Sequence, residues 1–256
     1  MKKSILLISL AVLPLFGYSQ NVLPDWALGG FVRPEKANPI ITPNPSNQFD
    51  CPMQDKKIGW EESDVFNPAA TVKDGKIYVL YRAEDNSATG IGKRTSRIGL
   101  AESEDGIHMK RRKTPVMYPD KDNMKEYEWE GGCEDPRVTM TEDGLYVMAY
   151  TSWNRKVARL CIATSHDLVK WEKHGPAFAK AYNGATSDDL VNWTPILDEK
   201  NELATVIKPR PQYFDSALTE CGPPAILTDK GIVLLYNGKN QTHDSKRDKR
   251  FTAGAY

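Results

Sequence analysis

The stretch Glu130-Gly131-Gly132-Cys133-Glu134-Asp135-Pro136-Arg137 decides how the rest of the chain is interpreted. It places three acids, two glycines and one arginine directly before a strong strand pattern. Residues 138–150 alternate in polarity on both sides of Asp143-Gly144, which is typical of a β-hairpin. Because proline cannot donate to a strand ladder, we expect Pro136 at the first residue of a strand or on an edge strand. The pattern therefore predicts acids held at the start of a strand, and a solvated acidic turn is the alternative.

The same layout occurs three times. Asn67-Pro68, Asp135-Pro136 and Glu220-Cys221-Gly222-Pro223-Pro224 each precede a predicted hairpin, and 7, 8 and 7 residues separate the proline from the hairpin glycine. A repeated four-stranded unit is typical of a β-propeller, whose blades surround a central channel. We therefore predict an all-β propeller in which Asn67, Asp135 and Glu220 line one channel.

A second motif, Ala-x-Ser-x-Asp-(Gly/Leu), alternates with the first at residues 101–106, 163–168 and 185–190. Ser103 and Ser165 are 62 residues apart, whereas Ser165 and Ser187 are only 22 apart. Four strands of about five residues with their turns do not fit into the shorter interval. We therefore expect that about one blade is missing near 184/185. Closing strands are likewise expected to be missing after residue 256.

The N-terminus has the pattern of a cleavable signal peptide. Met1-Lys2-Lys3 is basic, residues 4–18 are apolar, and Ser19-Gln20 offers a cleavage site. We expect a signal peptide over residues 1–20, a single partial propeller domain over residues 21–256, and a periplasmic or secreted bacterial protein.

The composition excludes several other classes of protein. Thirty-four basic and 34 acidic residues balance, so nucleic acid is not an indicated partner. No later apolar run approaches 18 residues, which argues against a transmembrane helix. The four cysteines include no C-x-x-C pair, so neither a metal site nor a cofactor is indicated. We interpret the cysteines as buried thiols, and disulfides are the alternative.

Several short motifs resemble glycoside hydrolase family 130, and the match runs from about residue 50 to residue 256. The motifs are residues 65–70, 80–83, 96–99, 134–137 and 222–225. The resemblance implies a five-bladed β-propeller that acts on β-mannosides. The family contains inverting mannoside phosphorylases and, in Bacteroides-type members, inverting β-1,2-mannosidases.

Two positions favour the hydrolase branch within this resemblance. The phosphorylases carry Tyr-His-Gly, with the histidine helping to bind phosphate, where this chain has Tyr236-Asn237-Gly238. They also lack an acid at the position of Glu220, where the hydrolases place a catalytic glutamate. A β-mannoside phosphorylase and a non-catalytic mannan-binding module are the alternatives, and the expected partner is a β-mannose-containing oligosaccharide.

Inverting hydrolysis needs two carboxyl groups roughly 6.5–9.5 Å apart, one as acid and one as base. The resemblance assigns Glu220 to that pair and places Asp135 beside the mannose hydroxyls of subsite −1. The resemblance places the second glutamate of the pair in the missing blade, so we expect this chain to be inactive or nearly so. The residues expected to position the sugar or the acids are Asn67, Arg82, Arg97, Arg137 and Asn237. For the arginines, salt bridging within the channel wall is the alternative.

Overall fold

The computed structural model describes Pro34 and residues 36–178, 185–186 and 194–240, apart from the single positions 91, 203, 206, 214, 223 and 230. These residues belong to the compact unit Arg33–Tyr256. The expected signal peptide and Gly184, at the expected junction, lie outside them. The signal peptide, the missing blade and the domain boundary at residue 21 therefore stay predictions.

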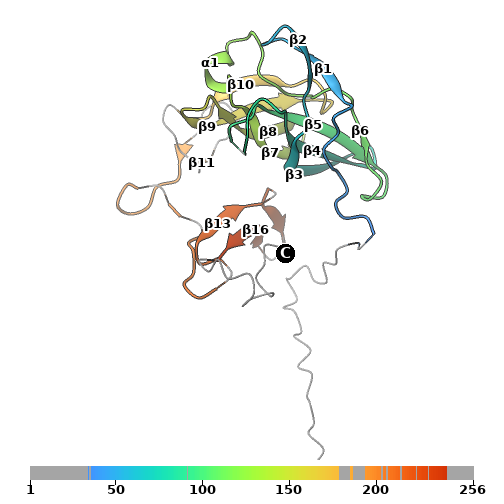
Figure 1. The fold of residues 1–256 in the computed structure, drawn as a ribbon. Helices are drawn as coiled ribbons and strands as arrows, with labels where there is room; N and C mark the ends of the chain where they lie inside the picture. Colours follow the sequence, from blue (N-terminus) through green and yellow to red (C-terminus); the bar gives the residue numbers. More distant parts are fainter. Residues whose placement is uncertain are drawn as a thin grey trace, which may run out of the picture. The chain divides into compact units, whose positions relative to one another are not determined.

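Strands dominate the described part of the chain, where α1 (Lys125–Glu128) is the one helix (Figure 1). None of the described helical residues forms a span long and apolar enough to cross a membrane. The strands of the large sheet are β3 (Asp64–Lys73), β4 (Lys76–Glu84), β5 (Ser96–Ser103), β6 (Lys110–Arg111), β7 (Gly132–Met140), β8 (Tyr146–Trp153), β9 (Ala158–Ser165) and β10 (Glu172–Pro176). The short paired strands are β1 (Gln48–Cys51) with β2 (Lys56–Gly59), β11 (Ala185–Thr186) with β12 (Thr194–Pro195), β13 (Leu218–Cys221) with β16 (Tyr236–Lys239), and β14 (Ile226–Thr228) with β15 (Gly231–Val233).

The large sheet consists of two antiparallel four-stranded units of the same layout. Strands β3 to β6 pair in chain order and form the first repeat, and β7 to β10 pair in chain order and form the second repeat. A single parallel pairing, Ser96 with Gly132, joins them through β5 and β7. The mostly β architecture and the repeated unit are thus confirmed, while the propeller and its number of blades stay predictions.

Turn residues explain the two central hairpins. Asp74 and Gly75 between β3 and β4 both have positive φ, 51° and 74°, as the favoured two-residue hairpin turn requires. Between β7 and β8, Gly144 takes φ 85° and the amide of Leu145 bonds to the hydroxyl of Thr141. Both hairpins lie where the alternation of apolar residues predicts them.

The prolines lie inside strands, which corrects the expectation that Pro136 and its acids stand at a strand's first residue. β7 begins four residues earlier and runs between β5 and β8, so it is no edge strand. The ladder register shifts between Glu134 and Arg137, and likewise between Phe66 and Ala69 in β3. A β-bulge leaves the extra residue unpaired, so it accommodates a proline without loss of a ladder bond.

The third predicted hairpin differs from the other two. β14 and β15 pair around the turn, but β13 and β16 form a separate pair rather than the continuation of the same ladder. Pro223 and Pro224 stand between β13 and β14 and lack backbone N–H groups, so two consecutive ladder donors are missing here. The amide of Gly222 still bonds to the carbonyl of Leu235 at 3.0 Å.

The Ser-x-Asp motif forms one turn after β5 and another after β9. The hydroxyls of Ser103 and Ser165 each accept two backbone N–H groups from the residues two and three positions further on. The residue after each aspartate has positive φ, 75° at Gly106 and 66° at Leu168. The motif is therefore a structural turn, and its third copy, around Ser187, lies outside the described residues.

Most of the core lies on the two repeats. The larger hydrophobic cluster draws side chains from both of them, and a second cluster packs β1 and Trp60 against β4 and β5. Cys51, Cys133 and Cys161 are free and buried, which confirms the thiol interpretation for these three. The side chain of Cys221 is not among those described.

Candidate active site

The candidate site forms where the two bulges face each other. Asn67 and Asp135 are the bulge residues, and both have left-handed backbone conformations, with φ 47° and 51°. Asn and Asp tolerate this region better than other side chains, although a following proline restricts them further. The amide Nδ2 of Asn67 donates to Oδ1 of Asp135 at 2.9 Å. The repeat thus brings together two of the three residues predicted to share a channel.

Arg82 on β4 connects this pair to further carboxyl groups. Its Nη1 donates to Oδ1 of Asp135 at 3.2 Å, and its Nη2 donates to Oε1 of Glu84 at 2.7 Å. The same Nη2 lies 2.8 Å from Oε1 of Glu134. Its guanidinium carbon stands 4.6 Å from the centre of the Phe66 ring. Arg82 is only 4% exposed, so a single buried cation serves three carboxyl groups.

Glu134 is a member of the site that the sequence analysis did not single out. It is 8% exposed and accepts a hydrogen bond from Ser96 Oγ at 3.1 Å. Burial raises the pKa of its carboxyl to about 7, the neighbouring Asp135 and Glu84 add to this rise, and Arg82 and Ser96 oppose it. The alternative of a solvated acidic turn is therefore wrong for Glu134, because the carboxyl is enclosed.

A close approach between the repeats encloses this carboxyl. Gly132 has φ 115°, and a side-chain carbon on it would lie 2.1 Å from the carbonyl oxygen of Ser96. The amide of Ser96 in turn donates to the carbonyl of Gly131 at 2.8 Å. The two glycines of the central stretch thus allow β7 to reach β5, which places Glu134 beside Ser96 and Arg82.

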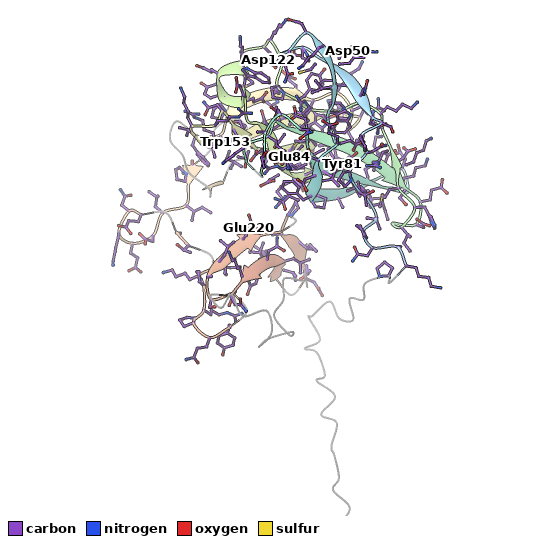
Figure 2. The ribbon with its side chains drawn as sticks, in the orientation of Figure 1. Asp50, Tyr81, Glu84, Asp122, Trp153 and Glu220 are labelled. Carbon is purple, nitrogen blue, oxygen red and sulfur yellow. The ribbon has the colours of Figure 1, made fainter. Side chains whose placement is uncertain are left out.

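Glu84, at the end of β4, is fully buried (Figure 2 labels it). Besides Arg82, its carboxylate receives Nη1 of Arg94 at 3.3 Å, and that guanidinium also bonds to Asp64. Glu84 therefore has two cationic partners. A signal for Glu84 existed in the sequence, since it stands two residues after Arg82 and so faces the same side of the strand.

The contacts described for Arg97 and Arg137 are with Asp85, Phe49 and the carbonyl of Pro136. Arg97 is 1% exposed; its Nη1 donates to Oδ2 of Asp85 at 2.9 Å and its guanidinium lies over Phe49. Half-buried Arg137 donates to the carbonyl of Pro136 at 2.8 Å. The contacts of Arg97 match the salt-bridge alternative, and a sugar-positioning role for either arginine stays a prediction.

Glu220 and Asn237 form a pair of their own. They are cross-strand partners in the short sheet of β13 and β16, and both side chains are exposed (Figure 2 labels Glu220). The position that separates the two branches of the resemblance therefore lies directly opposite the predicted catalytic glutamate. That Glu220 shares a channel with Asp135 stays a prediction.

The described residues around Asp135 suit a neutral polyol. Both hydrogen bonds described for Asp135 end on Oδ1, and its side chain is 27% exposed, so the carboxylate is held in place and partly open to a ligand. A carboxylate held rigidly by an amide and a guanidinium is a good acceptor for sugar hydroxyls. Within the described part of the chain, no group of three or more His, Cys, Asp or Glu side chains is arranged to hold a metal ion.

Comparison with known proteins agrees with this geometry. The model of glycoside hydrolase family 130, described as β-1,4-mannooligosaccharide phosphorylase, matches residues 31–185. A 1,2-β-oligomannan phosphorylase of Thermoanaerobacter sp. (strain X514) is 33% identical over 233 residues, which cover 80% of this chain and 71% of that protein. The chain therefore belongs to glycoside hydrolase family 130, whose members act on mannosides as phosphorylases or hydrolases.

Two solved structures are similar over most of the chain. One was reported with the finding that this family of mannoside phosphorylases contains glycoside hydrolases that target β-1,2-mannosidic linkages in Candida mannan. It is 54% identical with a TM-score of 0.82 and covers 87% of this chain and 73% of that one. A glycosyl hydrolase from Bacteroides ovatus is 53% identical with a TM-score of 0.82 and covers 90% of this chain and 76% of that one.

Proposed function

We propose that this chain carries the site of an inverting β-1,2-mannosidase. The observation that carries the proposal is the pairing of Glu220 with Asn237 across β13 and β16. A carboxylate stands where the resemblance puts the catalytic glutamate of the hydrolases, and an amide replaces the phosphate-binding histidine of the phosphorylases. The solved structure linked to β-1,2-mannosidic hydrolases, at 54% identity, supports the same branch.

In this proposal the two halves of the site have different tasks. Asp135, fixed by Asn67 and Arg82, holds the hydroxyls of the mannose in subsite −1. Glu220 acts as one member of the acid/base pair, either protonating the leaving oxygen or activating water. The sequence predicts that the other member is absent, which would leave this chain with binding and little turnover.

A β-mannoside phosphorylase is the second candidate, because the 33% and 29% identical relatives from Thermoanaerobacter are both phosphorylases of β-1,2-linked mannosides. The two reactions differ in the nucleophile and hence in the product. Hydrolysis yields free mannose, first as the inverted α-anomer, whereas phosphorolysis yields mannose 1-phosphate and requires phosphate.

The test is to incubate the purified protein with β-1,2-mannobiose, with and without phosphate, and to follow the products by NMR and the binding by calorimetry. Phosphate-independent release of α-mannose supports the hydrolase, and phosphate-dependent mannose 1-phosphate overturns it. In a form that turns over, Glu220→Gln should lower release roughly 10²–10⁴-fold. Glu199→Gln, an exposed glutamate in a turn, is the control.

Binding without either product would indicate a mannan-binding module for the chain as it stands. A second form, with the corresponding segment of a longer relative inserted between Gly184 and Ala185, then tests whether the missing blade is the cause. Restored release in that form supports the site assignment, whereas continued inactivity contradicts it.

We also propose export to the periplasm or beyond, on the strength of the N-terminal pattern. Protein recovered from the periplasm should begin near Asn21. Recovery with Met1 retained in the cell envelope would refute this.

A further inference from the structure

We propose that Glu84 and Glu134 form a carboxyl pair that carries one proton, and that this proton keeps Arg82 directed at Asp135. Glu134 is then a positioning residue of the site. Only the effect on sugar binding rests on the proposed function. The protonation itself is a property of the folded chain.

The two carboxyl groups converge on the same polar atoms. Oε1 of Glu84 and Oε1 of Glu134 lie 2.7 Å and 2.8 Å from the same Nη2 of Arg82. They also lie 3.4 Å and 3.1 Å from the same hydroxyl, Ser96 Oγ. That hydroxyl accepts Nε of Arg82 at 3.1 Å and has one proton to donate, so it satisfies one carboxylate at a time.

The charges around this point do not balance. β3 contributes Asp64 and the neutral Asn67 and Phe66, and β5 contributes the neutral Ser96. The ladder partner of Glu134 on β8 is the neutral Thr151. The charged groups are Arg82 and Glu84 on β4, Glu134 and Asp135 on β7, Asp64 on β3, and Arg94 from the loop before β5. Within these contacts, four carboxyl groups meet two guanidinium groups; the other charged groups nearby are the Arg97–Asp85 pair and Arg137 on β7. Glu84 and Glu134 are almost completely buried, so water cannot stabilise the excess negative charge. Binding a proton therefore costs less free energy than keeping both carboxyl groups ionised.

The geometry assigns the proton to Glu134. Glu84 has two cationic partners, Arg82 and Arg94, which favour its ionised form. Among the described contacts Glu134 has one cationic partner, Arg82, and it stands beside Asp135 in the chain. The pKa of about 7 that burial gives Glu134 agrees with this assignment.

The protonation state of Glu134 affects Asp135 through Arg82. With Glu134 neutral, Nη2 of Arg82 serves Glu84 and its Nη1 serves Asp135, at 3.2 Å the longest of its three carboxyl contacts. Once Glu134 releases its proton to solvent, its carboxylate competes for the guanidinium and adds charge beside Asp135. The hold on Asp135 weakens as a result, and so should the binding of a ligand at that residue.

The first test compares the wild type with Glu134→Gln by thermal unfolding between pH 4 and pH 9. A carboxyl whose pKa in the folded protein is raised from 4.5 to about 7 stabilises the fold fully below pH 4.5 and loses that contribution as the pH rises toward 7. Glutamine mimics the neutral acid at every pH. Across this window the wild type should therefore lose roughly 3–10 °C in unfolding midpoint relative to the variant.

Glu84→Gln is the matched comparison within the pair. It removes one of the carboxyl groups that raise the pKa of Glu134, so the window between pH 4.5 and pH 7 should narrow, while burial of Glu134 keeps part of it. Parallel curves for the wild type and Glu134→Gln would overturn the proposal, and so would a window in Glu84→Gln as wide as that of the wild type.

The second test follows binding of β-1,2-mannobiose against pH. Wild-type affinity should fall above pH 7, Glu134→Gln should retain affinity without this fall, and Glu134→Ala should lose affinity at every pH. Equal loss in the Gln and Ala variants would contradict a neutral working form of Glu134. Absence of sugar binding in every protein, with the unfolding window intact, would count against the proposed function while supporting the shared proton.

Discussion

The first and second repeats present a bulge at the same ladder position and fill it with different chemistry. Phe66 pairs with Arg82 just before the first bulge, and Glu134 pairs with Thr151 just before the second. The first repeat thus supplies the cation, Arg82. The second repeat supplies its carboxyl partner, Glu134, at the ladder position that Phe66 occupies in the first repeat. The bulge residue is a neutral amide in one repeat and an acid in the other.

This difference shows that the two repeats share the backbone of the bulge, whereas the chemistry of the bulge side chain differs between them. Left-handed Asx-Pro bulges recur because they aim a side chain out of the ladder at a fixed place. The identity of that side chain is free to vary, so one copy became a hydrogen-bond donor and the other its acceptor. A duplicated backbone can build an asymmetric site in this way, and no symmetric pair of acids is needed.

A second feature, a buried tyrosine–glutamate–cation contact, is common to both repeats. Tyr81 donates to Glu61 at 2.8 Å, and Tyr150 donates to Glu128 at the same distance. Each glutamate is fully buried and also meets a cation at the same position of the fourth strand of its repeat. The contacts are Arg111 with Glu61 at 3.3 Å and Lys173 with Glu128 at 2.6 Å. Burial raises the pKa of both carboxyls. We call the contacts of Glu61 with Tyr81 and Arg111 the first buried lock, and those of Glu128 with Tyr150 and Lys173 the second buried lock.

Making the two bulges identical is the change from which we expect the largest effect. Asp135→Asn gives the second bulge the residue of the first, and asparagine tolerates the left-handed conformation equally well. The fold should persist, with an unfolding midpoint within a few degrees of the wild type. In a form that turns over, mannose release should fall roughly 10²–10⁴-fold. Assays with β-1,2-mannobiose measure this, with exposed Asp74→Asn as the control; undiminished release would remove Asp135 from the site.

Removing the cation that the first repeat supplies should have the next largest effect. Arg82→Met preserves most of the side-chain volume but leaves Glu84 and Glu134 without their common partner. Breaking a buried ion pair from one side costs about 3–5 kcal/mol. Chemical denaturation at pH 8, where Glu134 is ionised, should show this loss, and the loss should be smaller at pH 5. A cost below about 1 kcal/mol at both pH values would contradict the charge imbalance described for this cluster.

The two buried locks should differ in strength. Lys173→Met removes a cation 2.6 Å from Glu128, whereas Arg111→Met removes one 3.3 Å from Glu61, which Asn47 also supports with a hydrogen bond. We expect about 3 kcal/mol of destabilisation for the first variant and about 1 kcal/mol for the second. Denaturant titrations of both variants measure the difference. Equal costs would mean that distance and supporting donors do not decide the strength of these locks.

Local chemistry made part of this structure predictable from sequence. The hairpins around Asp74-Gly75 and Asp143-Gly144 follow from residues that accept positive φ, and such turns depend on their own residues alone. The repeated spacing from the prolines to those glycines also predicted correctly that Asn67 and Asp135 lie close together. Each of these inferences uses neighbours in the sequence.

The remaining features depend on neighbours in space. Pro136 lies inside a strand because the partner strand tolerates a register shift, which no property of Pro136 itself indicates. Glu134 is buried because Gly132 lets β7 of the second repeat approach Ser96 of the first. Burial and partner choice of this kind arise only once two repeats pack together.

The smallest effect that we expect concerns the turns that follow β5 and β9. Ser103→Ala and Ser165→Ala each remove a hydroxyl that accepts two backbone N–H groups, at 3.0–3.3 Å for Ser103 and 2.9–3.2 Å for Ser165. Loss of such a side-chain acceptor costs about 1 kcal/mol. Both turns have the same hydrogen bonds and a left-handed fourth residue, so the two variants should lose the same stability. Gly106 meets the left-handed requirement without strain, whereas Leu168 has to be held there by its burial in the core. Because the lost hydrogen bonds are the same, denaturant titrations should still give equal costs for the serine variants. A cost more than about 1 kcal/mol larger for Ser165→Ala would contradict this and show that the second turn also holds Leu168 in the core.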